Sequence, residues 1–170
     1  MSQPDTSCAC ESLTTASGFL MKLRIPPPVL ALLFGFAMWQ ISKTGVLLVP
    51  SSEVKNVLSL AILVAGLLTE IFSVLSFRRA STTVNPMKPE TTTQLVTSGI
   101  YNLSRNPMYL GVLLVLSSLA LWLGSVLNIG VLFLFVFYIT LFQIIPEEKV
   151  LSGIFPETFL QYKSRVRRWV

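Results

Sequence analysis

The sequence predicts an all-α integral membrane protein with four helical spans, and three observations lead to that fold class. Apolar residues make up 52% of the 170-residue chain. Charged residues make up only 12%, compared with about 25% in an average soluble domain. The apolar residues gather in four long runs, and the basic residues lie almost entirely at one end of these runs. This pattern argues against an ordinary soluble domain.

The histidine and cysteine content excludes several kinds of site. The chain has no histidine, so it has no His-based triad, histidine proton shuttle or usual zinc constellation. Its two cysteines, Cys8 and Cys10, are poorly placed to pair with each other. They are either exposed thiols in a tail, or a site for a metal held between chains or for a lipid. We expect no resident metal.

The N-terminal part divides into a tail and a first span. Residues 1–24 are mostly Ser, Thr and small residues, which predicts a disordered cytosolic tail. Residues 25–170 are expected to form a single membrane-embedded domain. Its first run, Val29–Ile41, is interpreted as an uncleaved span because no small-residue cleavage site follows it. It is the weakest span, since Lys43 limits its length unless that side chain reaches the far interface.

The second run, Val54–Phe77, is long enough to cross a membrane at a tilt and contains one acidic residue. Glu70 would cost about 3 kcal/mol at the bilayer centre, so it should not face lipid. It either lines a cavity that opens toward the cytosol or hydrogen-bonds to a neighbouring helix.

The last two runs, Pro107–Leu123 and Val126–Ile145, are separated by a short turn at Gly124. So short a turn predicts an antiparallel helical hairpin, whose second helix we expect to end at Pro146. The polar stretch 80–106 before the hairpin is expected to be an ordered cytosolic loop. A fifth span results if this loop re-enters the membrane.

The chain after Glu147 is amphipathic. Apolar residues recur there at steps of four and three, which is the spacing of one helical face. The apolar series is Phe155, Phe159, Tyr162, Val166 and Trp169, and the basic series is Lys163, Arg165, Arg167 and Arg168. The pattern predicts an amphipathic C-terminal helix that lies on the membrane surface or packs on the protein's own cytosolic face.

The distribution of Lys and Arg predicts the orientation. With four spans, the N-terminus, the 78–106 loop and the C-terminus share one side, which carries all of the 13 basic residues except Lys43 and Lys55. Under the positive-inside rule this side is cytosolic. Anchoring to anionic lipid then explains the net charge of +5 without a nucleic-acid partner.

Polar residues converge at the cytosolic mouth of the hairpin. The loop entering the third span and the pair Glu147-Glu148 emerge at the same membrane face, so Arg105 can meet either carboxylate. Tyr101 and Tyr109 add aromatic faces, which attract a cation such as a sulfonium. The alternative interpretation is an ion pair that clamps two helix ends beside two interfacial tyrosines.

These residues carry a resemblance to a known superfamily. The string L-V-T-S-G-I-Y-N-L-S-R-N-P-M-Y-L-G runs from Leu95 to Gly111, and the block after the fourth span contains Glu147, Glu148, Leu151, Phe155 and Tyr162. In this order, and over about residues 76–170, the sequence resembles the isoprenylcysteine carboxyl methyltransferase and phospholipid methyltransferase superfamily, including its small bacterial members.

The resemblance implies a small helical membrane methyltransferase that uses S-adenosylmethionine without a Rossmann domain. The cofactor pocket would face the cytosol, between the loop, the hairpin and the C-terminal segment. Cofactor contacts are implied for Gln94, Leu95, Val96, Tyr101, Asn106, Pro107, Met108, Tyr109 and Glu147, with supporting electrostatic roles for Arg105 and Glu148. No residue is assigned as catalytic.

Three positions depart from the family pattern. Asn106 replaces a histidine, so it can hydrogen-bond but not titrate, and Pro156 replaces a glycine. Gln143 stands where prenylcysteine methyltransferases have an arginine that would suit the substrate carboxylate. This difference argues against a prenylcysteine acceptor.

The predicted function is therefore S-adenosylmethionine-dependent methyl transfer at the cytosolic face of a bacterial inner membrane. The acceptor is a membrane lipid, another lipophilic molecule or a small molecule. A carboxylate or thiolate acceptor needs no base, whereas for an amine or alcohol Glu148 or Glu70 would remove the proton. The alternatives are a membrane reductase with a related helical core and a non-catalytic membrane scaffold.

Overall fold

The computed structural model describes residues 26–44, 52–79 and 95–170, and within these ranges the chain is helical and contains no strand. The predictions for the tail 1–24 with Cys8 and Cys10, for loop residues 80–94 and for Gln94 lie outside the described residues. The elements are α2 (Pro27–Ser42), α3 (Glu53–Arg79), the 3-10 turn η2 (Gly99–Asn102), α4 (Pro107–Leu123), α5 (Leu127–Ile139), the π-helical segment η3 (Thr140–Ile144), α6 (Ile145–Ile154) and α7 (Pro156–Arg165).

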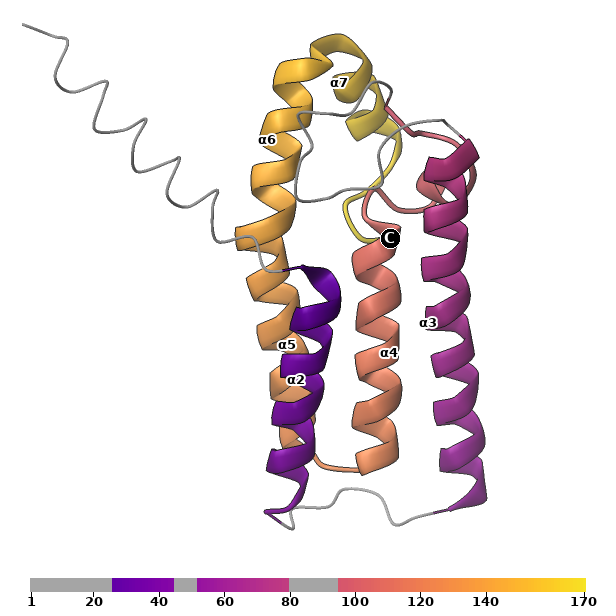
Figure 1. Ribbon diagram of the computed structural model, residues 1–170, viewed down its shortest axis with the longest axis vertical. Coiled ribbons are helices and arrows are strands. Elements are labelled where there is room, and N and C mark those ends of the chain that lie inside the picture. Colours follow the sequence, from indigo (N-terminus) through magenta and orange to yellow (C-terminus); the bar gives the residue numbers. More distant parts are fainter. Residues whose placement is uncertain (1–25, 45–51, 80–94) are drawn as a thin grey trace, which may run out of the picture.

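The helices form an elongated bundle in which α4 is central (Figure 1). Helix α3 packs along α4 on one side, and α2 packs against both α4 and α5. The end of α3, the start of α4 and the helices α6 and α7 lie at one end of the bundle, with the α4–α5 turn at the opposite end. The segments predicted to meet at the cytosolic face therefore share one end of the molecule.

Two stretches have the length and apolar composition needed to cross a membrane, Glu53–Ser76 and Leu127–Ile154. Helices α2 and α4 are apolar but shorter, with 16 and 17 residues. At about 1.5 Å per residue they are somewhat shorter than a hydrocarbon core of about 30 Å. The all-helical architecture is thus confirmed for the described residues, and spanning by α2 and α4 stays a prediction.

The fourth apolar helix does not end at Pro146, contrary to the sequence prediction. It continues through η3 into α6 and reaches Ile154. Proline lacks the N–H of a regular helix, and its ring crowds the carbonyl four residues earlier. The π turn widens the helix just before the proline, with the N–H of Ile145 donating to the carbonyl of Thr140, five residues back. This wider turn accommodates Pro146 without a break.

The turn between α4 and α5 forms where the sequence places it. Helix α4 ends at Leu123, and Gly124 follows in the left-handed conformation with φ 68°. Its N–H donates to the carbonyl of Ala120 at 3.0 Å, which closes the helix. Glycine adopts this conformation without the steric cost of a Cβ, so the predicted antiparallel hairpin is confirmed.

Close packing between α3 and α4 depends on two glycines. A Cβ built on Gly111 would lie 2.5 Å from Cγ of Glu70 and 3.1 Å from the carbonyl oxygen of Gly66. Farther along, the buried hydroxyls of Ser59 and Ser118 each donate to the backbone carbonyl of the other residue, at 2.9 and 2.8 Å. Small residues and reciprocal hydroxyl bonds are typical of helices that associate in lipid. The half-buried Glu70 is thus packed onto the backbone of α4.

The amphipathic C-terminal segment packs on the protein's own surface. Phe159 and Tyr162 of α7 are buried against Val96 and Tyr101. The prediction that the helix continues through Trp169 is wrong: α7 ends at Arg165, and the next residue is already extended. Burial against the 95–101 segment explains why the apolar face of α7 does not need to face lipid.

Candidate functional site

The acidic pair at the start of α6 is connected to α4 by a buried tyrosine. The hydroxyl of Tyr109 donates to Oε1 of Glu147 at 2.8 Å, and Tyr109 is only 4% exposed. Tyr109 lies on the first turn of α4, two residues after Pro107 begins that helix. A hydrogen bond to a carboxylate at a buried position fixes the orientation of the carboxylate.

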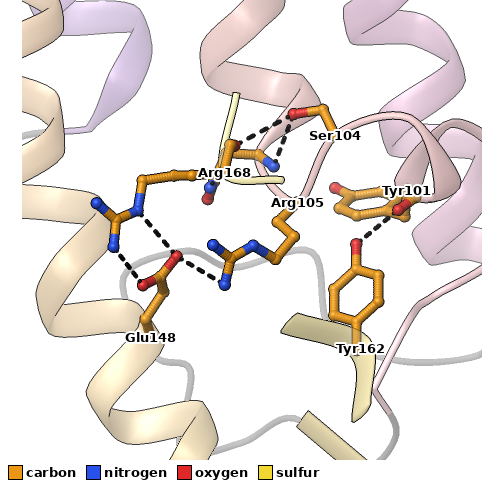
Figure 2. A network of polar contacts seen from close by, with 7 residues as sticks. Tyr101, Ser104, Arg105, Glu148, Tyr162 and Arg168 are labelled. Atoms are coloured by element: carbon orange, nitrogen blue, oxygen red, sulfur yellow. Dashed lines mark hydrogen bonds and ion pairs between the residues drawn. The ribbon is translucent and has the colours of Figure 1, made fainter. Parts of the chain in front are cut away.

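Glu148 is held by two arginines that come from different segments (Figure 2). Nη1 of Arg105 lies 3.2 Å from its Oε1. Arg168 forms a two-pronged contact, with Nε 3.1 Å from Oε1 and Nη2 2.8 Å from Oε2. Glu148 and Arg105 are largely buried, with side chains 12% and 9% exposed. The sequence prediction that Arg105 meets one carboxylate of the pair is confirmed.

The five C-terminal residues, 166–170, form what we call the C-terminal strap. Its backbone is fastened to the segment just before α4: the carbonyl of Arg167 accepts from the N–H of Arg105 at 3.1 Å. The carbonyl of Arg168 accepts from Nδ2 of Asn106 at 3.1 Å and from the hydroxyl of Ser104 at 3.4 Å. Trp169 packs against the core cluster that contains Tyr109. The side chain of Asn106 therefore binds the strap and does not cap α4.

Two buried tyrosines close the side of the site nearest α7. The hydroxyl of Tyr162 donates to the backbone carbonyl of Tyr101 at 2.7 Å. Burial raises the pKa of Tyr101 far above its usual value, and the negative charges of Tyr162 and Glu147 would raise it further. Burial also raises the pKa of Tyr162, and the nearby Arg105 charge only partly offsets this. Both phenols stay neutral at physiological pH.

Arg105 has unused hydrogen-bonding capacity. Its Nε and Nη1 are buried and have no hydrogen-bond partner among the described residues, although Nη1 lies at ion-pair distance from Glu148. Guanidinium donors left unsatisfied in a buried place are costly, so they are suited to an anionic group. Arg168 also stays protonated, because its hydrogen bond to Glu148 raises the pKa of the guanidinium group.

An apolar groove of about 370 Å³ lies beside this cluster, between the end of α3 and the η2 turn. It is lined by Phe72, Leu75, Ser76, Gly99, Ile100 and Leu103. Tyr101, on the same turn, is buried on the Glu147 side. The short turn therefore separates an apolar surface from the polar cluster.

The structure brings together some of the residues that the resemblance implies, and it places the others in the helices and segments around them. Tyr101, Arg105, Tyr109, Glu147 and Glu148 belong to the cluster described above. Val96 is buried against α7, Pro107 is the first residue of α4, and Met108 and Leu95 are partly buried. Among the described residues no group of three or more Cys, Asp or Glu side chains could hold a metal ion.

Sequence reasoning missed the two contributions of the C-terminal region. Arg168 was grouped with the basic residues of the amphipathic face, although its side chain is 33% exposed and pairs with Glu148. Tyr162 was recognised as part of a motif but not as a partner of Tyr101. The single signal was the matched motif tyrosine; nothing in the sequence pointed to Arg168.

Comparison with known proteins identifies the family. A phospholipid methyltransferase family model matches residues 54–158, more than half of the chain. The chain belongs to the phospholipid methyltransferase family. The match spans α3 to the start of α7 and includes the acidic pair, but it ends before the C-terminal strap.

The family is one of methyltransferases that act on membrane lipid, and the two long apolar helices agree with a membrane protein. An uncharacterized protein of Haemophilus influenzae is 44% identical to this chain over 64 residues. The aligned region covers 37% of this chain and 100% of the Haemophilus influenzae protein. No solved structure matches the chain.

Proposed function

We propose that the protein is an S-adenosylmethionine-dependent methyltransferase whose acceptor is a membrane lipid presented at the cytosolic face. One observation carries this proposal: within the family match, buried Tyr109 orients the carboxylate of Glu147, and the next residue, Glu148, contacts buried Arg105, whose Nε and Nη1 make no hydrogen bond among the described residues. An amino acid group offers one ammonium and one carboxylate, and the side chains of Glu147 and Arg105 are complementary to these two groups.

The residues present fit the chemistry of the donor molecule. Glu147 would take the ammonium group, and the free donors of Arg105 would take the carboxylate. Tyr101 and Tyr109 would attract the positive sulfonium, while Leu95, Val96, Asn106, Pro107 and Met108 would form the walls around the donor. When bound, S-adenosylmethionine would supply an electrophilic methyl carbon on a cationic sulfur, with the neutral thioether S-adenosylhomocysteine as the leaving group.

The chain's own residues would act by positioning and by excluding water. Holding acceptor and donor in line contributes several kcal/mol without any acid or base, which suits a site without histidine. Glu148 is committed to two guanidinium groups. We therefore assign it an orienting role, rather than the proton-accepting role considered from sequence.

The groove beside η2 suits the apolar part of a lipid acceptor. Phe72 and Leu75 are exposed on one face of α3. This face continues along Glu53–Ser76, the stretch of α3 that is long and apolar enough to cross a membrane. An acyl chain could pass from the bilayer along this face while its headgroup reaches over the η2 turn. The exposed Lys163 and Arg167 at the same end would attract anionic lipid at the cytosolic side of a bacterial inner membrane.

Binding of S-adenosylhomocysteine to the purified protein tests the proposal. Calorimetric titration should give measurable binding to the wild-type protein and none to Glu147→Gln. Glu157→Gln, which alters an exposed glutamate of α7, is the matched control and should bind as the wild type does. Absence of binding to the wild-type protein, or equal binding to Glu147→Gln, would contradict the proposal.

A methyl-transfer assay identifies the acceptor. Membranes from cells with and without the protein are incubated with methyl-tritiated S-adenosylmethionine, and lipids are separated from soluble molecules. Label that depends on the protein should appear in the lipid fraction. Label confined to soluble molecules would overturn the lipid acceptor, and titration with NADPH in place of the donor would reveal the reductase alternative.

A further inference from the structure

The C-terminal strap lies outside the family match, which ends at residue 158. The strap nevertheless lies across the start of α4. Three hydrogen bonds join its backbone to residues 104–106. Its position in the fold therefore depends on the same short segment that supplies Arg105 to the site.

The strap also supplies the positively charged guanidinium group of Arg168, which pairs with the carboxylate of Glu148. The Arg105 contact with Glu148 is a single 3.2 Å approach that lacks hydrogen-bond geometry. Arg168 instead meets both carboxylate oxygens, at 3.1 and 2.8 Å. A planar two-pronged contact of this kind fixes orientation as well as charge. Arg168 is thus the stronger of the two anchors of Glu148.

Glu147 and Glu148 are neighbours on one helix, so the direction of one side chain constrains the other. Consecutive residues of an α-helix point about 100° apart. With Glu148 held toward the strap, Glu147 faces the buried hydroxyl of Tyr109. If Glu148 were released, α6 could rotate, or Arg105 could turn to Glu147 instead.

We propose that Arg168, on the C-terminal strap, is a positioning residue of the donor site: by holding Glu148 it keeps Glu147 turned toward the bound donor. This inference rests on the proposed function, because it assigns Glu147 to the donor. It adds a partner for Glu148 that lies outside the family's matched region. Arg168 acts through Glu148 and does not touch the donor itself.

The test is calorimetric titration of S-adenosylhomocysteine into the purified full-length protein in lipid nanodiscs. Arg168→Gln should weaken binding about tenfold. Arg168→Lys keeps the positive charge but loses the bidentate contact with Glu148, and it should weaken binding about threefold. Arg165→Gln is the matched control, because Arg165 is an exposed arginine at the end of α7. It should bind as the wild type does.

A double-mutant cycle separates positioning from a general structural role. Glu148→Gln alone should weaken binding about as much as Arg168→Gln, and adding Arg168→Gln to it should change the affinity less than about twofold. Additive effects would overturn the inference, because Arg168 would then act by another route. A merely structural role predicts a lower melting temperature with unchanged affinity well below that temperature.

The remaining outcomes are distinct. If the wild-type protein does not bind S-adenosylhomocysteine, the proposed function fails and the inference fails with it. If the wild type binds and Arg168→Gln binds equally well, only the inference is overturned. Should Arg168→Gln not give folded protein, Arg168→Lys decides, and an affinity equal to that of the wild type would count against the role of Arg168.

Discussion

Glu147 and Glu148 are consecutive residues of α6, yet their surroundings differ. Glu148 lies between two guanidinium groups, whereas Glu147 accepts a hydrogen bond from the neutral phenol of Tyr109. Two guanidinium groups more than neutralise one carboxylate, so the cluster of Arg105, Arg168 and Glu148 carries a net positive charge. The same residue type thus has an orienting role at one position and, in our proposal, a ligand-binding role at the next.

Removing the Tyr109 hydroxyl should weaken donor binding without unfolding the protein. In Tyr109→Phe the carboxylate of Glu147 loses an orienting hydrogen bond, which for a charged acceptor is worth about 1.5–3 kcal/mol. We expect the dissociation constant for S-adenosylhomocysteine to rise at least about tenfold. Tyr138→Phe, which alters a tyrosine that packs against Phe142, is the control. Unchanged affinity in Tyr109→Phe would argue against the role of Glu147.

The Tyr162 hydroxyl should matter for stability rather than for binding chemistry. Tyr162→Phe leaves the carbonyl of Tyr101 without this donor and should lower the free energy of unfolding by about 1–3 kcal/mol. Burial raises the pKa of Tyr162, so its stabilising effect is complete below the unfolded pKa of about 10. It is lost as the pH rises above that value.

Thermal unfolding of Tyr162→Phe and the wild type, at neutral pH and near pH 11, measures both effects. The difference between the two proteins should be largest at neutral pH and should shrink at alkaline pH. A constant difference across this range would mean that the phenol does not titrate in the unfolding reaction.

At the scale of elements, the pair α3–α4 depends on the approach of two backbones. The glycines at 66 and 111 let the helices come together, and Glu70 packs directly over Gly111. Both α3 and α4 lead to site segments: η2 lies against the end of α3, and α4 carries Tyr109 near its start. Separation of these helices would move Tyr101 and Tyr109 relative to each other.

Gly111→Ala should destabilise this helix pair. The added Cβ would lie 2.5 Å from Cγ of Glu70, and overpacking of this kind commonly costs about 1–3 kcal/mol. We expect a lower melting temperature and weaker donor binding. Gly130→Ala is the control, because no atom lies within 4 Å of a Cβ at that position apart from its chain neighbours and the nearby backbone of its own helix. Equal melting temperatures for the two variants would contradict the described crossing.

At the scale of the whole molecule, the start of α4, α6 and α7 lie at one end of the bundle and the α4–α5 turn at the other (Figure 1). Apart from Lys43 and Lys55, the basic residues that the structure describes belong to the segments at the site end. From this charge bias, the positive-inside rule predicts that the site faces the cytosol. This predicted orientation suits the function that we propose, because S-adenosylmethionine is a charged, water-soluble molecule that would have to reach the site from an aqueous compartment.

Cysteine labelling tests the orientation. In a background in which Cys8 and Cys10 are replaced by serine, Gly153→Cys at the α6 end and Thr44→Cys after α2 place thiols at exposed positions. A membrane-impermeant maleimide added to intact cells should label position 44 but not position 153. Inside-out vesicles should give the reverse. Labelling of position 153 in intact cells would overturn the cytosolic assignment.

The sequence predicted features that depend on neighbouring residues better than features that depend on residues far apart in the chain. The hairpin followed from two apolar runs and Gly124, because a helix end and a left-handed glycine are local properties. Pro146 was misleading, since the same residue can end a helix or be accommodated by a wider turn, and only the surrounding packing decides which. The break after Arg165 was missed because residues 166 and 169 continue the helical spacing although they pack in the strap.

The sequence by itself determined the helical membrane class, the convergence of Arg105 with the acidic pair and the resemblance to a methyltransferase superfamily. Apolar runs, charge bias and motifs are written along the chain, so they can be read without coordinates. The tertiary structure decided that Arg168 shares Glu148, that Tyr109 orients Glu147 and that α7 covers the 95–101 segment. The residues that make these contacts are 20 to 61 positions apart. The pairing of such distant residues follows from packing, which no local pattern encodes.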